Sequence, residues 1–274
     1  MLQKPVSKSP VITIVASPGV GKTTLAGLFP KPVFMQSENA STVFEGWEEE
    51  SQPLMMPRLP RSVKDKVSTL ATALEQIRWL ITNEHDRETL VIDSVSTLNE
   101  MFEHELCVKY DVDNVADAAG GFHKGFIAVA EMHGQIRSAC EVLRDRKNMT
   151  IVFLSHLGIQ KIKSSPETDE YSVYTLAMGD KSTPHYVNHA DVVAYIKKDQ
   201  YVTGKETNKK GQVTKYGKIT DTGDRQLITS SDGRVGYINA KTRYPIPPEL
   251  KLDQGENPFL QYVPFFASKN NQEK

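Results

Sequence analysis

Residues 16–24 read Ala-Ser-Pro-Gly-Val-Gly-Lys-Thr-Thr, and they directly follow the apolar run of residues 10–15. That run, Pro-Val-Ile-Thr-Ile-Val, is short, β-branched and bounded by turn residues, which is typical of a buried parallel strand. The stretch after it fits the phosphate-binding loop pattern, with Ala16 in place of the usual first glycine and an intact Gly-Lys-Thr end. The sequence therefore predicts a strand, a loop that binds phosphate and a helix, in that order.

This loop predicts a nucleotide site that also holds a metal ion. Backbone N–H groups in such a loop turn toward phosphate, and Gly19 gives the backbone the freedom to do so. We expect Lys22 to contact the β- and γ-phosphates and Thr23 to ligate Mg²⁺, with the positive end of the helix directed at the anion. The predicted cofactors are ATP and Mg²⁺, and the predicted nucleotide-binding residues are Ser17, Pro18, Gly19, Val20, Gly21, Lys22, Thr23 and Thr24.

Strand-like and helix-like segments alternate over the first 200 residues. The predicted strands are residues 10–15, 33–35, 89–92, 151–154 and 191–196. The predicted helices are residues 23–29, 62–83 with Ser62 as the cap, 97–110 and 124–146. This alternation predicts an α/β fold with a central, mostly parallel sheet flanked by helices.

The rest of the chain has a different pattern. Residues 158–189 are polar and without a sustained period, which predicts a long loop. Short alternating segments separated by turn residues fill residues 197–240 and predict a β meander. We therefore expect a core over residues 1–200, an extension of the same domain over residues 201–267 and a flexible tail over residues 268–274.

Three side chains are predicted to meet the phosphates at the carboxyl edge of the sheet. Asp93 ends the strand Leu-Val-Ile-Asp, where a carboxylate holds Mg²⁺ through water. Glu38 lies just beyond the second strand, where it can orient water, and His156 ends the fourth strand, where it can sense the γ-phosphate. The candidate catalytic residues are Glu38, Lys22 and His156. The competing interpretations are a capping role for Asp93, an exposed surface position for Glu38 and a structural role for His156.

The segment Leu-Val-Ile-Asp-Ser-Val at residues 90–95 is very similar to the Walker B segment of the RecA-like P-loop ATPases, and Glu38 occupies the place of their catalytic glutamate. Within that branch the chain resembles compact bacteriophage RecA-core proteins, which bind ATP and of which some are single-strand annealing recombinases. The resemblance covers residues 10–200 and implies a RecA-like P-loop fold. It also implies that His156 stands where the family has a polar sensor, usually glutamine or asparagine.

Two further implications of the resemblance concern partners. Residues 158–189 would correspond to a DNA-binding loop, and residues 240–244 would lie where RecA-like subunits reach a neighbour's nucleotide with basic side chains, here Lys241 and Arg243. Such a contact between subunits favours oligomers on DNA.

The loop itself carries groups that suit single-stranded DNA. Its lysines can touch phosphates and its tyrosines can stack on bases. A solvated loop with no ligand is the competing interpretation. The residues concerned are Lys161, Lys163, Lys181, Tyr171 and Tyr174.

Composition limits the class of protein. With 33 basic and 34 acidic residues the formal net charge is −1, so any contact with nucleic acid must be local. No apolar run approaches the roughly 20 residues that span a bilayer, and the first ten residues are too polar for a signal peptide. Cys107 and Cys140 lack metal-ligand spacing and suggest a reducing compartment. We expect a cytoplasmic protein with no membrane partner, and the resemblance implies that it is encoded by a phage and present in its bacterial host.

The leading hypothesis is an ATP-dependent protein of recombination or single-strand annealing, which hydrolyses ATP slowly unless its subunits assemble on DNA. Its expected partners are single-stranded DNA, further copies of itself in oligomers or filaments, and a single-strand-binding protein. The near-neutral charge favours an alternative, a nucleotide-switched loader or regulator that binds a protein partner. A metabolite kinase is disfavoured because there is no cluster of arginines, and a GTPase because residues 208–211 end in glycine rather than aspartate.

Overall fold

The fold was analysed on a computed structural model, which describes residues 8–164, 169–204, 206–207, 213–215, 218–231 and 239–270. Residues 208–211 and 271–274 lie outside the described residues. In chain order the elements are β1 (Val11–Ala16), α1 (Lys22–Gly27), β2 (Pro32–Gln36), η1 (Ser41–Phe44), η2 (Glu49–Ser51), β3 (Leu54–Met55), α2 (Thr69–Thr82), β4 (Thr89–Asp93), α3 (Val95–Tyr110), η3 (Val115–Gly120), α4 (Lys124–Lys147), β5 (Thr150–Ile162), β6 (Tyr171–Leu176), α5 (Pro184–Val187), β7 (Val192–Thr203), β8 (Glu206–Thr207), β9 (Val213–Lys215), β10 (Lys218–Ile228), β11 (Lys241–Thr242), β12 (Glu249–Lys251), α6 (Pro258–Tyr262) and α7 (Pro264–Asn270).

One central sheet organises the molecule. Its strands run in the order β12-β10-β7-β1-β5-β4-β2-β3, with β11 and β6 attached to β7 and β5. The strands from β7 to β3 pair in parallel, and β10, β12, β11 and β6 pair antiparallel to their neighbours. The predicted α/β class with a mostly parallel sheet and C-terminal antiparallel strands is confirmed.

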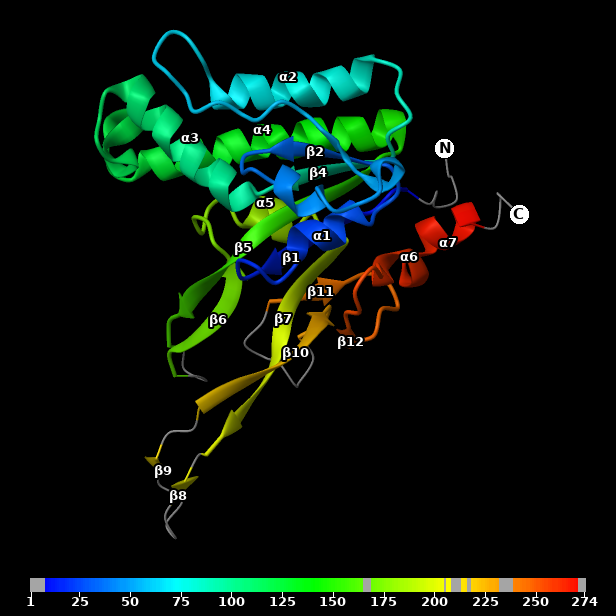
Figure 1. Cartoon of the computed structure of the whole chain (residues 1–274). Coiled ribbons are helices and arrows are strands. Elements are labelled where there is room, and N and C mark those ends of the chain that lie inside the picture. Colours follow the sequence, from blue (N-terminus) through cyan, green and yellow to red (C-terminus); the bar gives the residue numbers. More distant parts are fainter. Residues whose placement is uncertain are drawn as a thin grey trace, which may run out of the picture.

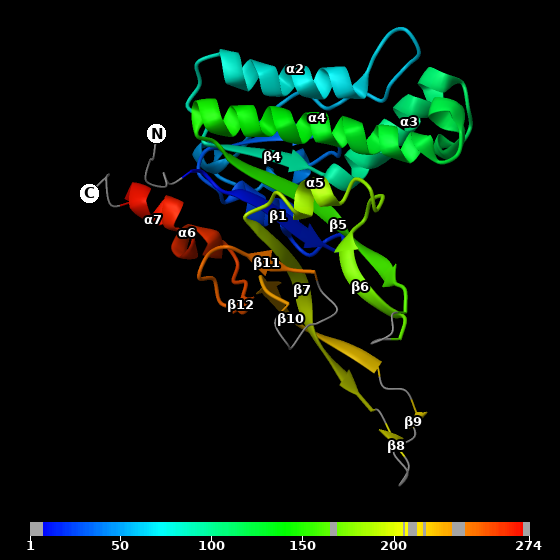
Figure 2. The same ribbon diagram turned by 180° about the vertical axis from the view of Figure 1, so that it is seen from behind.

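Helices cover both faces of the sheet, as Figures 1 and 2 show from opposite sides. Helices α2, α3 and α4 pack on one face, where Phe102 and Phe153 are fully buried. Helices α1, α6 and α7 pack on the other face, around Phe34 and Phe259. Every residue of β1 and β4 is buried, because strands covered on both faces carry continuous apolar runs. The sheet therefore forms a rigid frame for the loops at its carboxyl edge.

The prediction of a long loop over residues 158–189 is wrong. Strand β5 continues through Ile162 and pairs antiparallel with β6, and the short helix α5 follows. We name this the β5–β6 hairpin. In its outer part exposed and half-buried residues alternate, with Ile159 at 68% exposure. The residue types there do not alternate between apolar and polar in step with exposure, so the pattern by which a half-buried strand is identified is missing. The hairpin projects from the sheet in the same direction as the hairpin of β7 and β10 (Figure 1).

The start of the second predicted helix also differs. Helix α2 begins at Thr69, and its cap is Ser68, whose hydroxyl accepts the N–H of Ala71. Val63 and Val67, which fitted the helical stripe, instead pair with each other in an isolated antiparallel bridge. A serine that precedes an apolar period marks a helix start only when the residues after it are free to form a helical turn, and here the bridge holds residues 63–67.

The C-terminal part contains helices as well as strands. Helices α6 and α7 follow β12, each begins with a proline at its first position, and neither was predicted. Residues 268–270, the start of the expected tail, belong to α7. Cys140 is buried in α4 and Cys107 is half-buried in α3. Within the described ranges, no helix has the length and apolar character needed to cross a membrane.

Candidate active site

The predicted phosphate loop joins β1 to α1 at the carboxyl edge of the sheet. Gly19 and Gly21 have φ values of 74° and 100°, in the left-handed region that favours glycine. The loop leads directly into α1, whose first residue is Lys22, and the side chain of that lysine is turned inward, with the residue only 8% exposed. The backbone thus has the form that the loop sequence requires.

Thr23 and Asp93 form a pair that suits a divalent cation. The Thr23 hydroxyl donates to Asp93 Oδ2 at 2.8 Å, and Asp93 is 2% exposed. Its other oxygen, Oδ1, is buried and has no hydrogen-bond partner among the residues that the structure describes. Burial raises the pKa of Asp93 above its usual value and outweighs the hydrogen bond from Thr23 and the charge of Lys22, which act to lower it. Hard oxygen donors with one oxygen left over fit Mg²⁺. A capping role for Asp93 is wrong, because Ser94 caps α3.

Glu38 sits in a cluster of hydrogen-bond donors rather than at the open surface. Its Oε1 accepts from His156 Nε2 at 2.8 Å and from Thr97 Oγ1 at 2.6 Å, and also from the hydroxyl of Ser94. Burial acts to raise the pKa of this carboxyl, but the hydrogen bonds from His156, Ser94 and Thr97 outweigh it and lower the pKa to about 2. Glu38 is therefore an anchored carboxylate at neutral pH.

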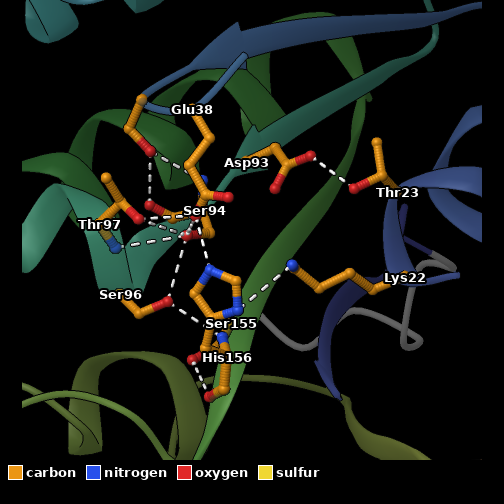
Figure 3. A network of polar contacts seen from close by, with 10 residues as sticks. Lys22, Thr23, Glu38, Asp93, Ser94, Ser96, Thr97, Ser155 and His156 are labelled. Carbon is orange, nitrogen blue, oxygen red and sulfur yellow. Dashed lines mark hydrogen bonds and ion pairs between the residues drawn. The ribbon is translucent and has the colours of Figure 1, made fainter. Parts of the chain in front are cut away.

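A chain of polar contacts connects the phosphate loop to Glu38 (Figure 3). Lys22 Nζ lies 3.4 Å from His156 Nδ1, on the side of the ring opposite Glu38. Because an ammonium group only donates, Nδ1 acts as the acceptor and Nε2 carries the proton that goes to Glu38. The backbone N–H of His156 donates to Ser96 Oγ at 2.9 Å, which fixes the ring's position on β5. His156 thus lies between the phosphate-binding lysine and the candidate catalytic carboxylate.

Backbone contacts hold the ends of β2 and β4 together behind this cluster. The N–H groups of Ser37 and Glu38 donate to the Asp93 carbonyl at 2.9 and 3.2 Å. The Ser37 hydroxyl donates to the Ser94 carbonyl and accepts the Ser94 N–H, at 2.8 and 2.7 Å. The Asp93–Ser94 peptide bond is cis. The positions of Glu38 and Asp93 are therefore coupled through main-chain atoms.

The structure brings together five residues that were chosen from the sequence: Lys22, Thr23, Glu38, Asp93 and His156. Their catalytic and metal-binding roles stay predictions. Ser94 and Thr97 were missed, although Ser94 lies within the Walker B segment and Thr97 comes two residues after its end. A hydroxyl residue at a helix cap was the available signal.

Lys241 and Arg243 lie far from this site in their own chain. Lys241 is the first residue of β11 and Arg243 directly follows that strand. Strand β11 pairs with the first residues of β7, whereas the phosphate loop follows the last residue of β1, at the other end of the parallel strands. Lys241 Nζ donates to the Asn188 carbonyl at 3.0 Å, and Arg243 pairs with Asp191 at 3.0 Å. They cannot contact the nucleotide of their own subunit, and a contact with a neighbour's nucleotide stays a prediction.

The predicted DNA-binding residues divide into two groups. Lys161 and Lys163 lie on the β5–β6 hairpin and are exposed, and Lys161 is 3.5 Å from Glu170. Lys181 lies between β6 and α5, at the rim of a cavity of about 390 Å³. Tyr171 is 46% exposed, whereas Tyr174 packs against the core and its carbonyl accepts from Tyr195 at 3.2 Å. Of the two tyrosines, Tyr171 has the freer ring.

A profile of the family described as AAA domain covers residues 8–242, which includes every residue of the site above. No curated protein matches the chain.

Proposed function

Since the chain belongs to the AAA domain family, whose fold is that of the P-loop ATPases, we propose that it uses ATP to act on single-stranded DNA in recombination or strand annealing. ATP binding and hydrolysis are the general activity of the family. The DNA substrate is the specific part of the proposal.

Each residue at the site has its own role in the proposed hydrolysis of ATP. Lys22 neutralises the β- and γ-phosphates, and Thr23 and Asp93 are the residues that hold Mg²⁺. When bound, Mg²⁺ supplies positive charge against the phosphate oxygens. Glu38 orients the attacking water, and as a carboxylate with a pKa of about 2 it is a weak proton acceptor. Glu38 therefore acts mainly by holding the water in position, a role that its three donors support, and slow hydrolysis is expected.

One observation carries the DNA part of the proposal: a single strand, β5, contains His156 and continues into the exposed hairpin with Lys161 and Lys163. Single-stranded DNA whose phosphates bind these lysines would displace the end of β5, the same β-strand that holds the His156 ring against Glu38. DNA binding thereby has a covalent path of a few residues to the hydrolytic site. Coupling of this kind is reciprocal, so ATP also changes the affinity for DNA.

The test is ATP hydrolysis by the purified protein with and without single-stranded DNA, together with binding of a labelled oligonucleotide. We expect turnover that DNA stimulates and that is lost in Lys22→Ala and Glu38→Gln. Glu45→Gln is the matched control, since that carboxylate is exposed at the end of η1.

The outcomes separate the two parts of the proposal. Hydrolysis that ignores DNA, with no oligonucleotide binding at low salt, contradicts the DNA function and supports a nucleotide-switched regulator of a protein partner. Loss of hydrolysis in Glu45→Gln would contradict the assignment of Glu38.

A further inference from the structure

An arginine from a strand near one edge of the sheet reaches the phosphate loop. Arg225 lies on β10, two strands away from β1, and its Nη1 donates to the Val20 carbonyl at 3.3 Å. The two residues are 205 positions apart in the chain. The sequence contains no motif around Arg225 that marks it for this place.

The guanidinium fits against the loop because residue 21 is glycine. A Cβ atom at this position would lie 2.3 Å from Arg225 Nη1 and 3.6 Å from its Cζ. Gly21 also has a φ of 100°, a backbone conformation that favours glycine, and the absence of a side chain there leaves room for Arg225 in the position observed. Arg225 therefore packs directly on the turn whose N–H groups meet phosphate.

The charge of Arg225 is not neutralised within the described part of the chain. No carboxylate of the described residues forms an ion pair with it, and the nearby Asp224 pairs instead with Lys251 at 3.3 Å. Among the described residues only the Val20 carbonyl accepts from the guanidinium, so with respect to these residues four of its five N–H donors are open to another acceptor. A positive, planar group beside an anion-binding loop is suited to phosphate oxygens.

The backbone of β10 is shaped to bring Arg225 there. The register between β10 and β7 shifts between Asp221 and Arg225, and Gly223 within this bulge has a φ of 82°. Bulges turn a side chain out of the regular alternation of a strand. The Arg225 carbonyl accepts the N–H of Leu252 at 2.8 Å, so the residue is fixed between β7 and the segment after β12.

Arg225 and Lys22 approach the loop from opposite sides. Lys22 points toward His156 on β5, and Arg225 arrives across β7, while β1 lies between β5 and β7. In the proposed function the γ-phosphate lies on the side with His156, Glu38 and Asp93. With that orientation, the end of the triphosphate that is joined to the nucleoside lies on the side of Arg225.

We propose that Arg225 binds the α- and β-phosphates of the nucleotide held by its own subunit. On nucleotide binding the guanidinium exchanges its hydrogen bond to the Val20 carbonyl for bonds to phosphate oxygens. Both partners of these new bonds are charged, so the bonds are stronger than one from the guanidinium to a neutral carbonyl. The inference rests on the proposed ATP-binding function and adds a residue that acts within one subunit, unlike Lys241 and Arg243.

The experiment measures dissociation constants of ATP and ADP with Mg²⁺ by fluorescence of labelled nucleotides, for the full chain and for Arg225→Gln, Arg225→Lys and Lys251→Gln. Loss of a hydrogen-bonded charge predicts affinities about 10- to 100-fold weaker for both nucleotides in Arg225→Gln. Arg225→Lys keeps the charge but loses the planar fork, so its defect is smaller. Lys251→Gln removes the same charge from the neighbouring strand at an exposed site and stays within about two-fold of wild type.

Each outcome supports or overturns a direct contact between Arg225 and the α- and β-phosphates. Equal weakening of ATP and ADP, with a smaller change in the hydrolysis rate at saturating ATP, supports a direct phosphate contact. Wild-type affinity in Arg225→Gln overturns the inference and leaves the ATPase function intact, and so does a defect for ATP alone. A fall in the saturated rate without a change in affinity also overturns it. Failure of the wild-type protein to bind either nucleotide overturns the proposed function and this inference together. If Arg225→Gln does not fold, the dissociation constants of ATP and ADP for Arg225→Lys are compared with those of wild type. Equal weakening for both nucleotides then supports the contact, and unchanged values overturn it.

Discussion

Glu38 accepts hydrogen bonds from the hydroxyls of Ser94 and Thr97 and from His156, and loss of either hydroxyl should lower the rate of ATP hydrolysis measurably. Thr97→Val keeps the shape of the side chain and removes the 2.6 Å hydrogen bond to Glu38 Oε1. We expect the rate of ATP hydrolysis to fall by about 3- to 10-fold, because a hydrogen bond to a charged group is lost while two donors remain. Nucleotide affinity is expected to stay unchanged, since Thr97 does not contact the phosphate loop.

The steady-state rate and the nucleotide dissociation constant check this prediction. Thr42→Val, an exposed threonine in η1, is the control and should match wild type. An unchanged rate in Thr97→Val would show that Ser94 and His156 alone position the carboxylate.

The lowered pKa of Glu38 also predicts a dependence of stability on pH. Folding lowers this pKa from 4.5 to about 2, so the ionised carboxylate stabilises the fold fully above pH 4.5 and progressively less as the pH falls toward 2. Glutamine does not titrate. The difference in free energy of unfolding between wild type and Glu38→Gln should therefore be constant near neutral pH and narrow below pH 4.5.

Urea unfolding at several pH values measures this difference. The same comparison can be made between Thr97→Val and the double variant Thr97→Val with Glu38→Gln. Glu38 has one donor fewer in this background, so the difference in free energy of unfolding should decrease less as the pH falls. A difference that widens as the pH falls contradicts the assignment of the donors.

At the scale of elements, the β5–β6 hairpin is expected to carry the electrostatic part of DNA binding. The double variant Lys161→Ala and Lys163→Ala removes two exposed charges from it. We expect weaker binding of single-stranded DNA, and a slope of log affinity against log salt that is about 1.4 smaller, from about 0.7 for each lost phosphate contact.

Oligonucleotide binding over a range of salt concentrations gives this slope. Lys109→Ala, an exposed lysine near the end of α3 whose Nζ lies 5.5 Å from the Tyr110 ring centroid, is the control and should leave the slope unchanged. An equal effect of the control would place the DNA elsewhere on the surface.

At the scale of the whole molecule, the two ends of the parallel strands predict how subunits cooperate. The nucleotide site lies at the carboxyl edge, and Lys241 and Arg243 lie at the opposite edge, beside Asp191. If these cations serve a neighbour's nucleotide, Lys22→Ala and the double variant Lys241→Ala with Arg243→Ala are each inactive alone. Mixed one to one, they should regain about a quarter of wild-type hydrolysis, the share of interfaces at which an intact loop faces intact cations.

Hydrolysis by the mixture in the presence of single-stranded DNA checks this prediction. Retained nucleotide binding by the double variant shows that its own site is folded. A mixture with no more activity than its parts would contradict the shared site.

The sequence by itself determined the phosphate loop, the strand that ends in Asp93 and the alternation that makes the sheet mostly parallel. These features are local: a loop of fixed spacing and an apolar run can be recognised without knowing what packs on them. Because the carboxyl ends of parallel strands meet at one edge, the same reasoning also brought Glu38 and His156 to the site.

Only the tertiary structure decided which side chains complete that site. The hydroxyls of Ser94 and Thr97 reach Glu38 because the ends of β2 and β4 are joined through backbone hydrogen bonds. Arg225 reaches Val20 because strand order places β10 two strands from β1, a neighbourhood that no spacing in the sequence records. Strand pairing between segments far apart in the chain depends on the summed packing of the whole core, and local patterns do not contain that information.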